Sequence, residues 1–437
     1  MDFSSSLVWG RTGAELSLPT LCADAECDHL IIGAGLAGLS AAYHILKKFG
    51  ACRKVIVVDA HPLGSGASGR NSGMLGPGIG KQYHLLVKQY GDIKAREIFA
   101  HTLEALNYST QLIRNEKLEC DLVIGSQFKV STNAANDRQL WLECEALTAA
   151  GFEIRTYDRQ AIKGIVDSPV YLSALEYAST ATVDPMKLVV SLAKEILAMG
   201  GEIYVNTCCA RPQEHTVVAN GHTLRFSRAL LATNGFTPSL NRLRGRVIPI
   251  STSLMLSAPL LPSQRAQLGL QPNNAIIDVR RIFNYFRVTA DNRLLFGGGS
   301  PFYSTENVLR RQRDGTQEAY KVYESLNGGM SKFLPQLANI RIEKVWSGTI
   351  GVTLDNFPVI TRGQSSVDSM VGCCGHGLAL SLAYGASYAS WLEELSCSPE
   401  LPWYRNSAPY LAPPALLPLA SNSYIKFLRW ADTFNGA

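Results

Sequence analysis

The sequence of 437 residues contains no uninterrupted run of about 20 apolar residues, the length that a helix needs to span a bilayer. Its first residues lack the basic region followed by an apolar stretch that marks a secretory signal. We therefore expect a cytoplasmic protein without a membrane span, in which the thiols stay reduced.

The sequence also lacks a strong excess of charge and a metal-binding pattern of cysteines. Its 41 basic and 36 acidic residues give a net charge of +5 that is not organised into runs. Nucleic acid is therefore not an expected partner, although a small anionic substrate fits this charge. The ten cysteines show no metal-ligand spacing, so we predict no metal site.

The most informative feature that is present runs from Asp28 to Asp59. It reads as a buried strand, a turn with Gly33, Gly35 and Gly38, an amphipathic helix and a second strand that ends at Asp59. In a dinucleotide site the first glycine permits a tight turn, the second lets the backbone approach a pyrophosphate, and the third lets the helix pack on the strand. The helix N-terminus attracts phosphate, and the carboxylate can accept hydrogen bonds from ribose. The pattern predicts an adenine dinucleotide.

A glycine-rich segment follows, with seven glycines between Gly64 and Gly80. So many residues without a side chain indicate a loop that lies against a flat ligand, whereas a flexible linker is the alternative. The apolar residues within it and the Arg70–Asn71 pair favour an ordered loop.

The remaining pattern alternates helices and strands. We expect a helix from Asp92 to about Glu119, paired strands within Asp121–Thr132, and a helix to about Ala150. Asp184 and Pro185 predict the start of another helix. Further elements are expected as strands at Glu202–Asn206, Thr216–Val218, Thr223–Phe226, Ala229–Thr233 and within 245–300, and as helices between Glu306 and Leu334 and from Gly377.

Several segments occur in a characteristic order after the first unit. They are Gly66–Gly73, the helix at Asp184, Ala232–Gly235, Arg293–Gly298, Trp346–Gly348, Thr353–Pro358 and Gly375–Gly377. In this order they resemble the D-amino-acid-oxidase-type family of FAD-dependent oxidoreductases over nearly the whole chain. The segments at Gly66–Gly73 and Arg293–Gly298 are most similar to the branch of γ-glutamylputrescine oxidases and glycine and sarcosine oxidases.

The resemblance implies FAD as the dinucleotide, and it implies the residues that hold it. The expected cofactor residues are Gly33, Ala34, Gly35, Leu36, Ala37, Gly38, Asp59, Ala60, Gly66, Ala67, Ser68, Gly69, Arg70, Asn71, Ser72, Gly73, Cys209, Ala232, Thr233, Asn234, Gly235, Gly348, Thr349, Gly375, His376, Gly377 and Leu378. Some relatives attach FAD through a cysteine near the segment that here reads Gly348–Gly351, and no cysteine occurs there. We therefore expect noncovalent FAD.

The family chemistry is the transfer of a hydride from a carbon bearing an amine to flavin N5, which gives an imine that hydrolyses. A helix starting at Gly377 would aim its positive end at the flavin ring, with His376 beside it through its backbone and position. The sequence shows no catalytic triad or paired carboxylates. The oxidation of a neutral amine requires chiefly orientation and the exclusion of water.

Candidate substrate residues are Arg70, Asn71, Tyr285, Arg287 and His376. Alternation along a strand would place Tyr285 and Arg287 on one face, where the tyrosine could pack on a substrate and the arginine could pair with a carboxylate. A partly exposed sheet face with an ordinary arginine is the alternative. Arg70 and Asn71 are expected to orient the substrate or contact the flavin.

We predict an α/β (α+β) fold of two domains. An FAD-binding Rossmann-like domain is built from the discontinuous segments 28–80, 175–244 and 340–398. A substrate domain with a mainly antiparallel sheet and flanking helices comprises 81–174 and 245–339. Residues 1–27 form an N-terminal extension, and residues 399–437 form a tail that packs on the body.

The predicted function is oxidation of a γ-glutamylputrescine-like amine or an N-substituted amino acid, with oxygen or another electron acceptor. An FAD-dependent amino acid dehydrogenase that does not use oxygen, an NAD(P)-dependent dehydrogenase and a noncatalytic flavin-binding partner are the alternatives. We make no prediction of the oligomeric state.

Overall fold

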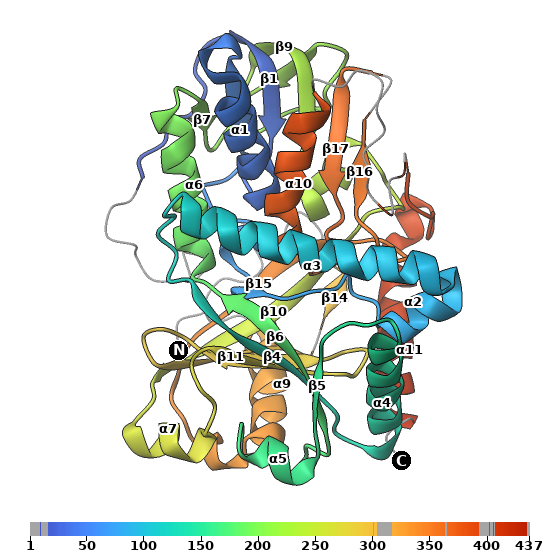
Figure 1. The fold of residues 1–437 in the computed structure, drawn as a ribbon. Helices are drawn as coiled ribbons and strands as arrows, with labels where there is room; N and C mark the ends of the chain where they lie inside the picture. The colour runs from blue at the N-terminus through green and yellow to red at the C-terminus, as the bar shows by residue number, and fades with distance from the viewer. Residues whose placement is uncertain are drawn as a thin grey trace.

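The computed structural model describes residues 9, 16–299, 301–303, 317–362, 365–392, 402, 405 and 407–434. Within these residues the strands form two sheets, one in the upper half and one in the lower half of the view in Figure 1. One sheet is largely parallel and the other largely antiparallel, which confirms the predicted mixed fold class. The part of the predicted helix from Glu306 to residue 316 lies outside the described residues.

The smaller sheet has seven strands in the order β16-β17-β9-β1-β2-β7, with β8 paired to β9. Its strands are β1 (Ala25–Ile32), β2 (Val55–Val58), β7 (Glu202–Tyr204), β8 (Thr216–Ala219), β9 (His222–Leu231), β16 (Val359–Thr361) and β17 (Val367–Val371). Strand β1 runs parallel to both β2 and β9. Because parallel neighbours need a crossover connection, helix α1 (Leu36–Phe49) joins β1 to β2.

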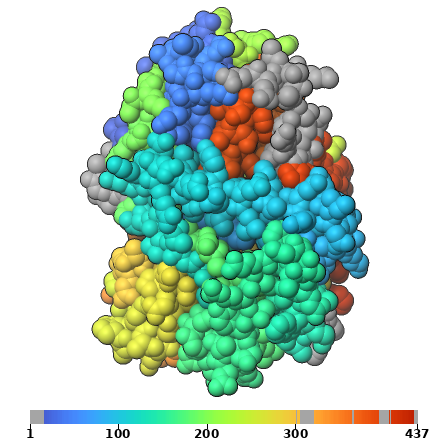
Figure 2. All heavy atoms as spheres, in the orientation of Figure 1, coloured from blue at the N-terminus to red at the C-terminus, as the bar shows by residue number. Residues whose placement is uncertain are grey.

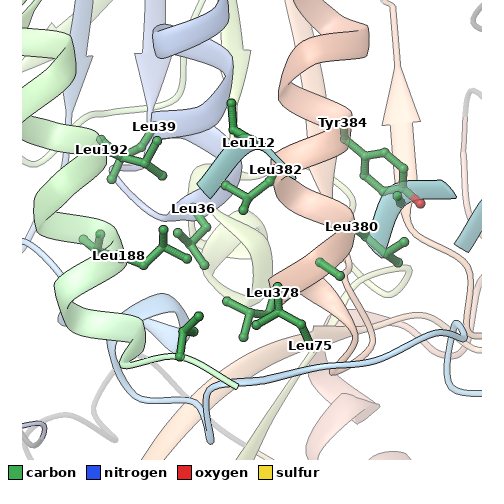
Figure 3. Packing of buried hydrophobic residues seen from close by; sticks show 14 of the residues in the cluster. Leu36, Leu39, Leu75, Leu112, Leu188, Leu192, Leu378, Leu380, Leu382 and Tyr384 are labelled. Carbon is green, nitrogen blue, oxygen red and sulfur yellow. The ribbon is translucent and has the colours of Figure 1, made fainter. Parts of the chain in front are cut away.

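Helix α1 packs between α6 (Pro185–Ala198) and α10 (Gly377–Trp391). Leu36 and Leu39 of α1 lie between leucines of α6 and α10 and are almost completely buried (Figure 3). Full burial of one such side chain stabilises the fold by about 1.5–3 kcal/mol. The start of α6 is as predicted, because the Asp184 side chain accepts hydrogen bonds from the N–H groups of Met186 and Lys187.

The larger sheet has ten strands, in the order β14-β10-β13-β12-β11-β4-β6-β3, with β15 beside β10 and β5 beside β6. Its strands are β3 (Met74–Leu75), β4 (Val123–Val130), β5 (Arg155–Tyr157), β6 (Ala174–Thr182), β10 (Ile248–Pro259), β11 (Asn274–Asp278), β12 (Asn284–Val288), β13 (Arg293–Gly298), β14 (Phe302–Tyr303) and β15 (Ile342–Val352). Its pairs are antiparallel except that of β4 with β11.

The remaining helices flank this sheet and connect the two halves. They are α2 (Tyr83–Tyr90), α3 (Asp92–Asn115), α4 (Ala134–Ala149), α5 (Arg159–Lys163), α7 (Pro262–Leu268), α9 (Gln317–Phe333) and α11 (Leu417–Phe434). In Figure 2 the residues of α3 form a band between α1 and α10 above and α4 and α5 below. The Ser109 hydroxyl of α3 donates to the carbonyl of Ala379 in α10, which ties the band to the smaller sheet.

Two predictions of strands were wrong. Residues 121–132 do not form paired strands, because β4 is one strand, and the glycine at position 125 lies at an irregularity in its pairing with β6. The two stretches expected at 223–226 and 229–233 are likewise one strand, β9, because its pairing with β1 runs through the residues between them.

Sheet membership crosses the predicted domain boundaries at three places. Strands β3, β6 and β15 fall in residues that we assigned to the cofactor domain, yet they pair in the larger sheet. The division into domains therefore remains a prediction. In the described part of the chain, no helix has the combination of length and apolar character that a membrane crossing requires.

Helix α11 lies in the C-terminal segment that we expected to pack on the body. Ile425 and Ala431 of this helix are buried. The Asp432 carboxylate accepts hydrogen bonds from the backbone N–H groups of Arg281 and Ile282, which fixes the helix beside β12.

Candidate functional site

The turn between β1 and α1 brings backbone segments closer together than side chains would allow. Gly33 has a φ of +114°, and a Cβ on it would lie 2.6 Å from the carbonyl oxygen of Ala232. A Cβ on Gly38 would lie 2.0 Å from the carbonyl oxygen of Gly33 and 2.9 Å from the Ile31 side chain. The expectation that Gly38 lets the helix pack on the strand is therefore confirmed.

A pocket of about 850 Å³, part of it open to solvent, extends from the start of α1 to the start of α10. Predicted cofactor residues that line it are Gly35, Leu36, Ala37, Ala67, Ser68, Asn71, Ser72, Ala232, Asn234, Gly375, Gly377 and Leu378. Lining residues that sequence reasoning missed are Met74, Ile350, Pro358, Met370, Val371, Cys373, Leu380, Ser381 and Tyr384. Most of these are apolar residues of strands and helices, and nothing in the sequence distinguishes them from core residues.

Other predicted cofactor residues do not line this pocket. They are Gly33, Ala34, Gly38, Asp59, Ala60, Gly66, Gly69, Arg70, Gly73, Cys209, Thr233, Gly235, Gly348, Thr349 and His376. Gly33 and Gly38 are examples that allow close packing of the backbone next to the lining residues. Their contact with a cofactor remains a prediction.

Asp59, at the end of β2, holds the turn in place. Its Oδ2 accepts a hydrogen bond of 2.8 Å from the N–H of Ala34, and its Oδ1 accepts one of 2.9 Å from the N–H of His61. Burial raises the pKa of this carboxyl group. Burial also raises the pKa of Cys209 to about 12, and the nearby charge of Asp59 adds to that effect. Each oxygen of Asp59 keeps a lone pair that could accept a ribose hydroxyl.

The glycine-rich loop is ordered by its own polar side chains. Arg70, which is 5% exposed, donates from Nε to the carbonyl of Ser65 and from Nη1 to the carbonyl of Ser347 in β15. Asn71 donates from Nδ2 to the carbonyls of Ala67 and Ser68, and its Oδ1 accepts from the N–H of Gly73. The alternative of a flexible linker is therefore excluded.

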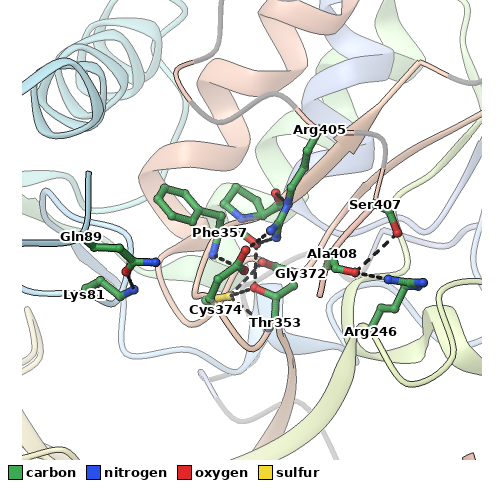
Figure 4. Close-up of polar contacts among 12 residues, drawn as sticks. Lys81, Gln89, Arg246, Thr353, Phe357, Gly372, Cys374, Arg405, Ser407 and Ala408 are labelled. Carbon is green, nitrogen blue, oxygen red and sulfur yellow. Dashed lines mark hydrogen bonds and ion pairs between the residues drawn. The ribbon is translucent and has the colours of Figure 1, made fainter. Parts of the chain in front are cut away.

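The turn before α10 is fastened to β15. The N–H of Cys374 donates to the carbonyl of Gly351, and the Thr353 hydroxyl donates to the carbonyl of Phe357. Arg405 donates to that same carbonyl and pairs with Asp355 (Figure 4). These contacts fix the start of α10, which begins at Gly377 as predicted.

His376 lies at the start of α10 as a neutral group. Burial lowers the pKa of its imidazole to about 4, and the positive charge of Lys129 acts in the same direction. Its Nδ1 lies 3.2 Å from the carbonyl oxygen of Cys374, so the neutral ring can donate its proton there. Such a histidine is not an acid–base group at neutral pH, in agreement with the positional role expected for it.

Tyr285 and Arg287 lie on the same face of β12, as alternation predicted, but they differ in burial. Arg287 is 3% exposed, and it donates to the carbonyls of Ser72 and Val183 at 2.7 Å each. Tyr285 is half-buried, and its ring lies on Gly297, where a Cβ would be 2.6 Å from two ring carbons. Arg287 therefore stabilises the fold by joining β12 to the carbonyls of Ser72 and Val183, and its contact with a substrate stays a prediction.

A polar cluster on β4 and α4 was missed by sequence reasoning. The Nζ atom of Lys129 lies 3.8 Å from Oε1 of Glu143 and 3.4 Å from the Tyr177 hydroxyl. Oε2 of Glu143 is 3.0 Å from both the backbone nitrogen and Nδ1 of His84. These four residues are spread over positions 84 to 177, and the nearest two, Lys129 and Glu143, are 14 positions apart, so no short motif could reveal them.

The pocket suits an anionic dinucleotide such as FAD. Its lining contains no Asp, Glu, Lys, Arg or His side chain. The N-termini of α1 and α10 both reach it, and neither helix has an acidic residue in its first turn or a side-chain cap at Gly35 or His376. In α1 the N–H of Leu36 donates to Ser68 Oγ at 2.8 Å. Helix N-termini, through their backbone N–H groups and partial positive charge, are binding sites for phosphate and for other negative charge. The residues present therefore fit the cofactor that the family resemblance implies.

Comparison with known proteins places these features in a family. A family model described as FAD dependent oxidoreductase (DAO) matches residues 28–391. Gamma-glutamylputrescine oxidoreductase from Escherichia coli is 28% identical over 402 residues, which cover 88% of this chain and 89% of the relative. A protein from Haemophilus influenzae named "Probable oxidoreductase OrdL" is 26% identical over 380 residues, which cover 84% of this chain and 83% of the relative.

The fold also matches solved structures. Glycine oxidase from Geobacillus kaustophilus superposes with a TM-score of 0.70 at 17% identity, over 86% of this chain and 97% of that one. At this identity the likeness concerns the fold alone. It agrees with the arrangement of two sheets described above.

Proposed function

This chain belongs to the D-amino-acid-oxidase-type family of FAD-dependent oxidoreductases, and from that premise we propose that it oxidises a carbon–nitrogen bond of a small amine or amino acid. The observation that carries this proposal is the position of the pocket. Its lining joins the N-termini of α1 and α10 to Met74 and Ile350, which belong to β3 and β15 of the larger sheet. A cofactor bound there would face the larger sheet.

The residues around this pocket suit the requirements of amine oxidation. When bound, FAD would supply the hydride acceptor that the reaction needs. The chain would supply orientation and the exclusion of water, because the lining is mainly glycine and apolar side chains. Tyr285 does not line this pocket, and its ring lies against Gly297 on the neighbouring strand β13. Loss of a hydride from the carbon beside a neutral amine nitrogen leaves an iminium ion, which water hydrolyses to a carbonyl compound and an ammonium or amine product.

The names of related proteins support an amine or amino acid as the substrate. The Escherichia coli relative is named for gamma-glutamylputrescine, and the Geobacillus structure is that of a glycine oxidase. We therefore propose a γ-glutamylputrescine-like amine or an N-substituted amino acid as the substrate class. The cytoplasm as its location and noncovalent attachment of FAD remain part of the same proposal.

An anaerobic reduction screen tests the proposal. The purified holoprotein is mixed with amines and amino acids in the absence of oxygen, and the flavin absorbance near its visible maximum is followed. At least one compound of the proposed class is expected to bleach the flavin. If no amine or amino acid does so while dithionite does, the proposal is wrong, and a noncatalytic flavin protein is favoured.

Readmission of oxygen to the bleached sample then identifies the electron acceptor. Rapid return of the yellow colour with release of peroxide would identify an oxidase. Slow return with oxygen and rapid return with an artificial quinone acceptor would identify a dehydrogenase.

A further inference from the structure

The face of the larger sheet that carries Tyr285 is covered by the glycine-rich loop over one row of residues only. Gln127, Ala275 and Arg287 are in register on neighbouring strands, so their side chains share this face. A Cβ on Gly76 would lie 1.8 Å from Gln127 Oε1, and one on Gly73 would lie 2.7 Å from Arg287 Nη2. The loop thus lies directly on this row, and all three of its residues are buried.

The next row on the same face is left open. Lys129, Ile277 and Tyr285 are in register with one another, two residues along from the covered row on each strand. All three are half-buried, in contrast to the buried residues of the covered row. The side chains of the intervening residues Phe128, Ile276 and Phe286 belong to the buried cluster on the other face. This second row, called the open row below, is therefore only partly covered, and its Tyr285 packs against the main core cluster.

The residues at the two ends of the open row, Tyr285 and Lys129, are chemically different. At one end the aromatic ring of Tyr285 lies against Gly297, and at the other end the charged side chain of Lys129 is 22% exposed. The loop also reaches the start of α10, because a Cβ on Gly80 would lie 3.5 Å from the His376 ring. The charge of Lys129 helps to lower the pKa of this histidine.

The ammonium group of Lys129 has capacity for another anion. It has three N–H groups, and its hydrogen bond to a described residue is the contact of 3.4 Å with the Tyr177 hydroxyl. Its contact with Glu143 is 3.8 Å, which is too long for a hydrogen bond. The other oxygen of Glu143, Oε2, accepts a hydrogen bond from the backbone N–H of His84 and lies 3.0 Å from its Nδ1. The carboxylate of Glu143 is therefore stabilised by His84 as well as by Lys129.

We propose that Lys129 binds the carboxylate of the substrate, and hence that this protein acts on amines that carry a carboxylate. The inference rests on the proposed oxidation of amines, and it names the residue that would bind the carboxylate, a group that both proposed substrate classes carry. The carboxylate would lie at the lysine end of the open row, near the N-terminus of α10, and the amine-bearing carbon would lie toward Tyr285. The sequence suggested that Arg287 binds the substrate carboxylate. Lys129 would do so instead, because the loop covers the arginine and leaves the lysine partly exposed.

Binding of small carboxylates to the oxidised holoprotein tests this inference without any turnover. Acetate, propionate and benzoate are each titrated against the matching amide, and Kd is taken from the change in the flavin spectrum. The wild-type protein is expected to bind at least one carboxylate roughly 10- to 100-fold more tightly than its amide. In Lys129→Met this preference should fall to about twofold or less.

Two matched variants show whether an effect of Lys129→Met comes from the lost charge or from a disturbed fold. Lys81→Met removes the lysine that follows Gly80 and donates to Gln89 (Figure 4), and it should keep the preference. Lys129→Arg retains a cation and should also keep it, which provides a readout if Lys129→Met loses its flavin. The inference is overturned if the wild type shows no preference, if Lys129→Met keeps it, or if Lys81→Met loses it equally. Carboxylate binding without reduction by any amine would instead leave Lys129 as an anion site and remove the proposed oxidation.

Discussion

The guanidinium group of Arg287 lies over the indole ring of Trp9, with 5.2 Å between the guanidinium carbon and the ring centroid. The same indole donates from Nε1 to the carbonyl of Asn71 and meets the ring of Trp346 edge to face. An aromatic residue near the N-terminus thus holds together the glycine-rich loop, β12 and β15. The indole ring of Trp9 and the carbonyls of Ser72 and Val183 together stabilise the buried charge of Arg287.

Replacement of Arg287 by methionine is expected to destabilise the protein. Burial lowers the pKa of the guanidinium to about 10, so it is still charged at neutral pH, and its loss leaves the carbonyls of Ser72 and Val183 without their donors. We expect a loss of about 2–4 kcal/mol in the free energy of unfolding, measured by urea denaturation. Arg281→Met, at an exposed arginine, should change it by less than about 1 kcal/mol.

Arg287→Met also tests whether this arginine binds the carboxylate of the substrate. If the folded variant binds carboxylates as tightly as the wild type does, its role is structural. A large loss of affinity at unchanged stability would support the role in substrate binding that the sequence suggested.

Gly38→Ala is expected to displace α1 and reduce FAD binding. The added Cβ would lie 2.0 Å from the carbonyl oxygen of Gly33, and both atoms belong to the rigid turn. Overpacking of this kind costs about 1–3 kcal/mol or more. Gly328→Ala is the control, because it lies in the helix α9 with no atom within 4 Å of the new Cβ, and it should stabilise by about 0.5–1 kcal/mol. The FAD content per chain and the urea midpoint of both variants measure these effects, and full FAD content in Gly38→Ala would contradict the assignment.

His29 is expected to make the protein sensitive to acid. Burial lowers the pKa of its imidazole to about 4, and its Nδ1 has no hydrogen-bond partner among the described residues. The unfolded chain takes up a proton near pH 6.5 whereas the folded protein does not, so stability is lost as the pH falls from 6.5 towards 4. At pH 5 the contribution is about 1–2 kcal/mol.

The change in unfolding free energy between pH 7 and pH 5 measures this contribution. His29→Leu should reduce the change by that amount, and part of it should remain because the pKa of His376 is lowered in the same direction. His61→Gln, at an exposed histidine, should leave the change as it is. An unaltered pH dependence in His29→Leu would show that this residue does not carry the effect.

FAD is expected to dissociate when the protein is denatured. Among the residues that line the pocket, Cys373 has a thiol, but burial raises its pKa and keeps it protonated, which makes it a poor nucleophile. After precipitation with acid, the yellow colour should be found in the supernatant. Colour that stays with the pellet would indicate a covalent bond, and its loss in Cys373→Ser would then locate that bond.

Elements with local signals could be predicted from the sequence. Asp184 and Pro185 predicted the start of α6, and Gly377 predicted the start of α10, because caps and the first helical turn depend on residues within one turn of each other. The turn at Gly33–Gly38 was predictable for the same reason. The division of 121–132 into two strands was wrong, because a strand that continues through Gly125 is stabilised by its pairing with β6 and not by its own sequence.

The open row on the larger sheet could not be predicted in this way. Alternation along β12 put Tyr285 and Arg287 on one face, which the structure confirms, but it could not tell which of them the loop would cover. That depends on contacts of the loop with Gln127 and Arg287, which are brought together by the register of β4, β11 and β12. Lys129 carried no signal, because a single lysine on a strand is ordinarily a solvated side chain.

The sequence alone determined the dinucleotide turn, because glycine spacing and helix starts act over a few residues of backbone. Its resemblance to a known family then indicated FAD as the dinucleotide. Only the tertiary structure decided which charged side chain the glycine-rich loop covers and which one stays partly exposed. Arg287 and Lys129 are 158 positions apart in the chain and lie on adjacent rows of one sheet face. Arg287 is held by backbone carbonyls beneath the loop, whereas Lys129 is partly exposed and lies 3.8 Å from Glu143. Strand register and loop packing set this difference.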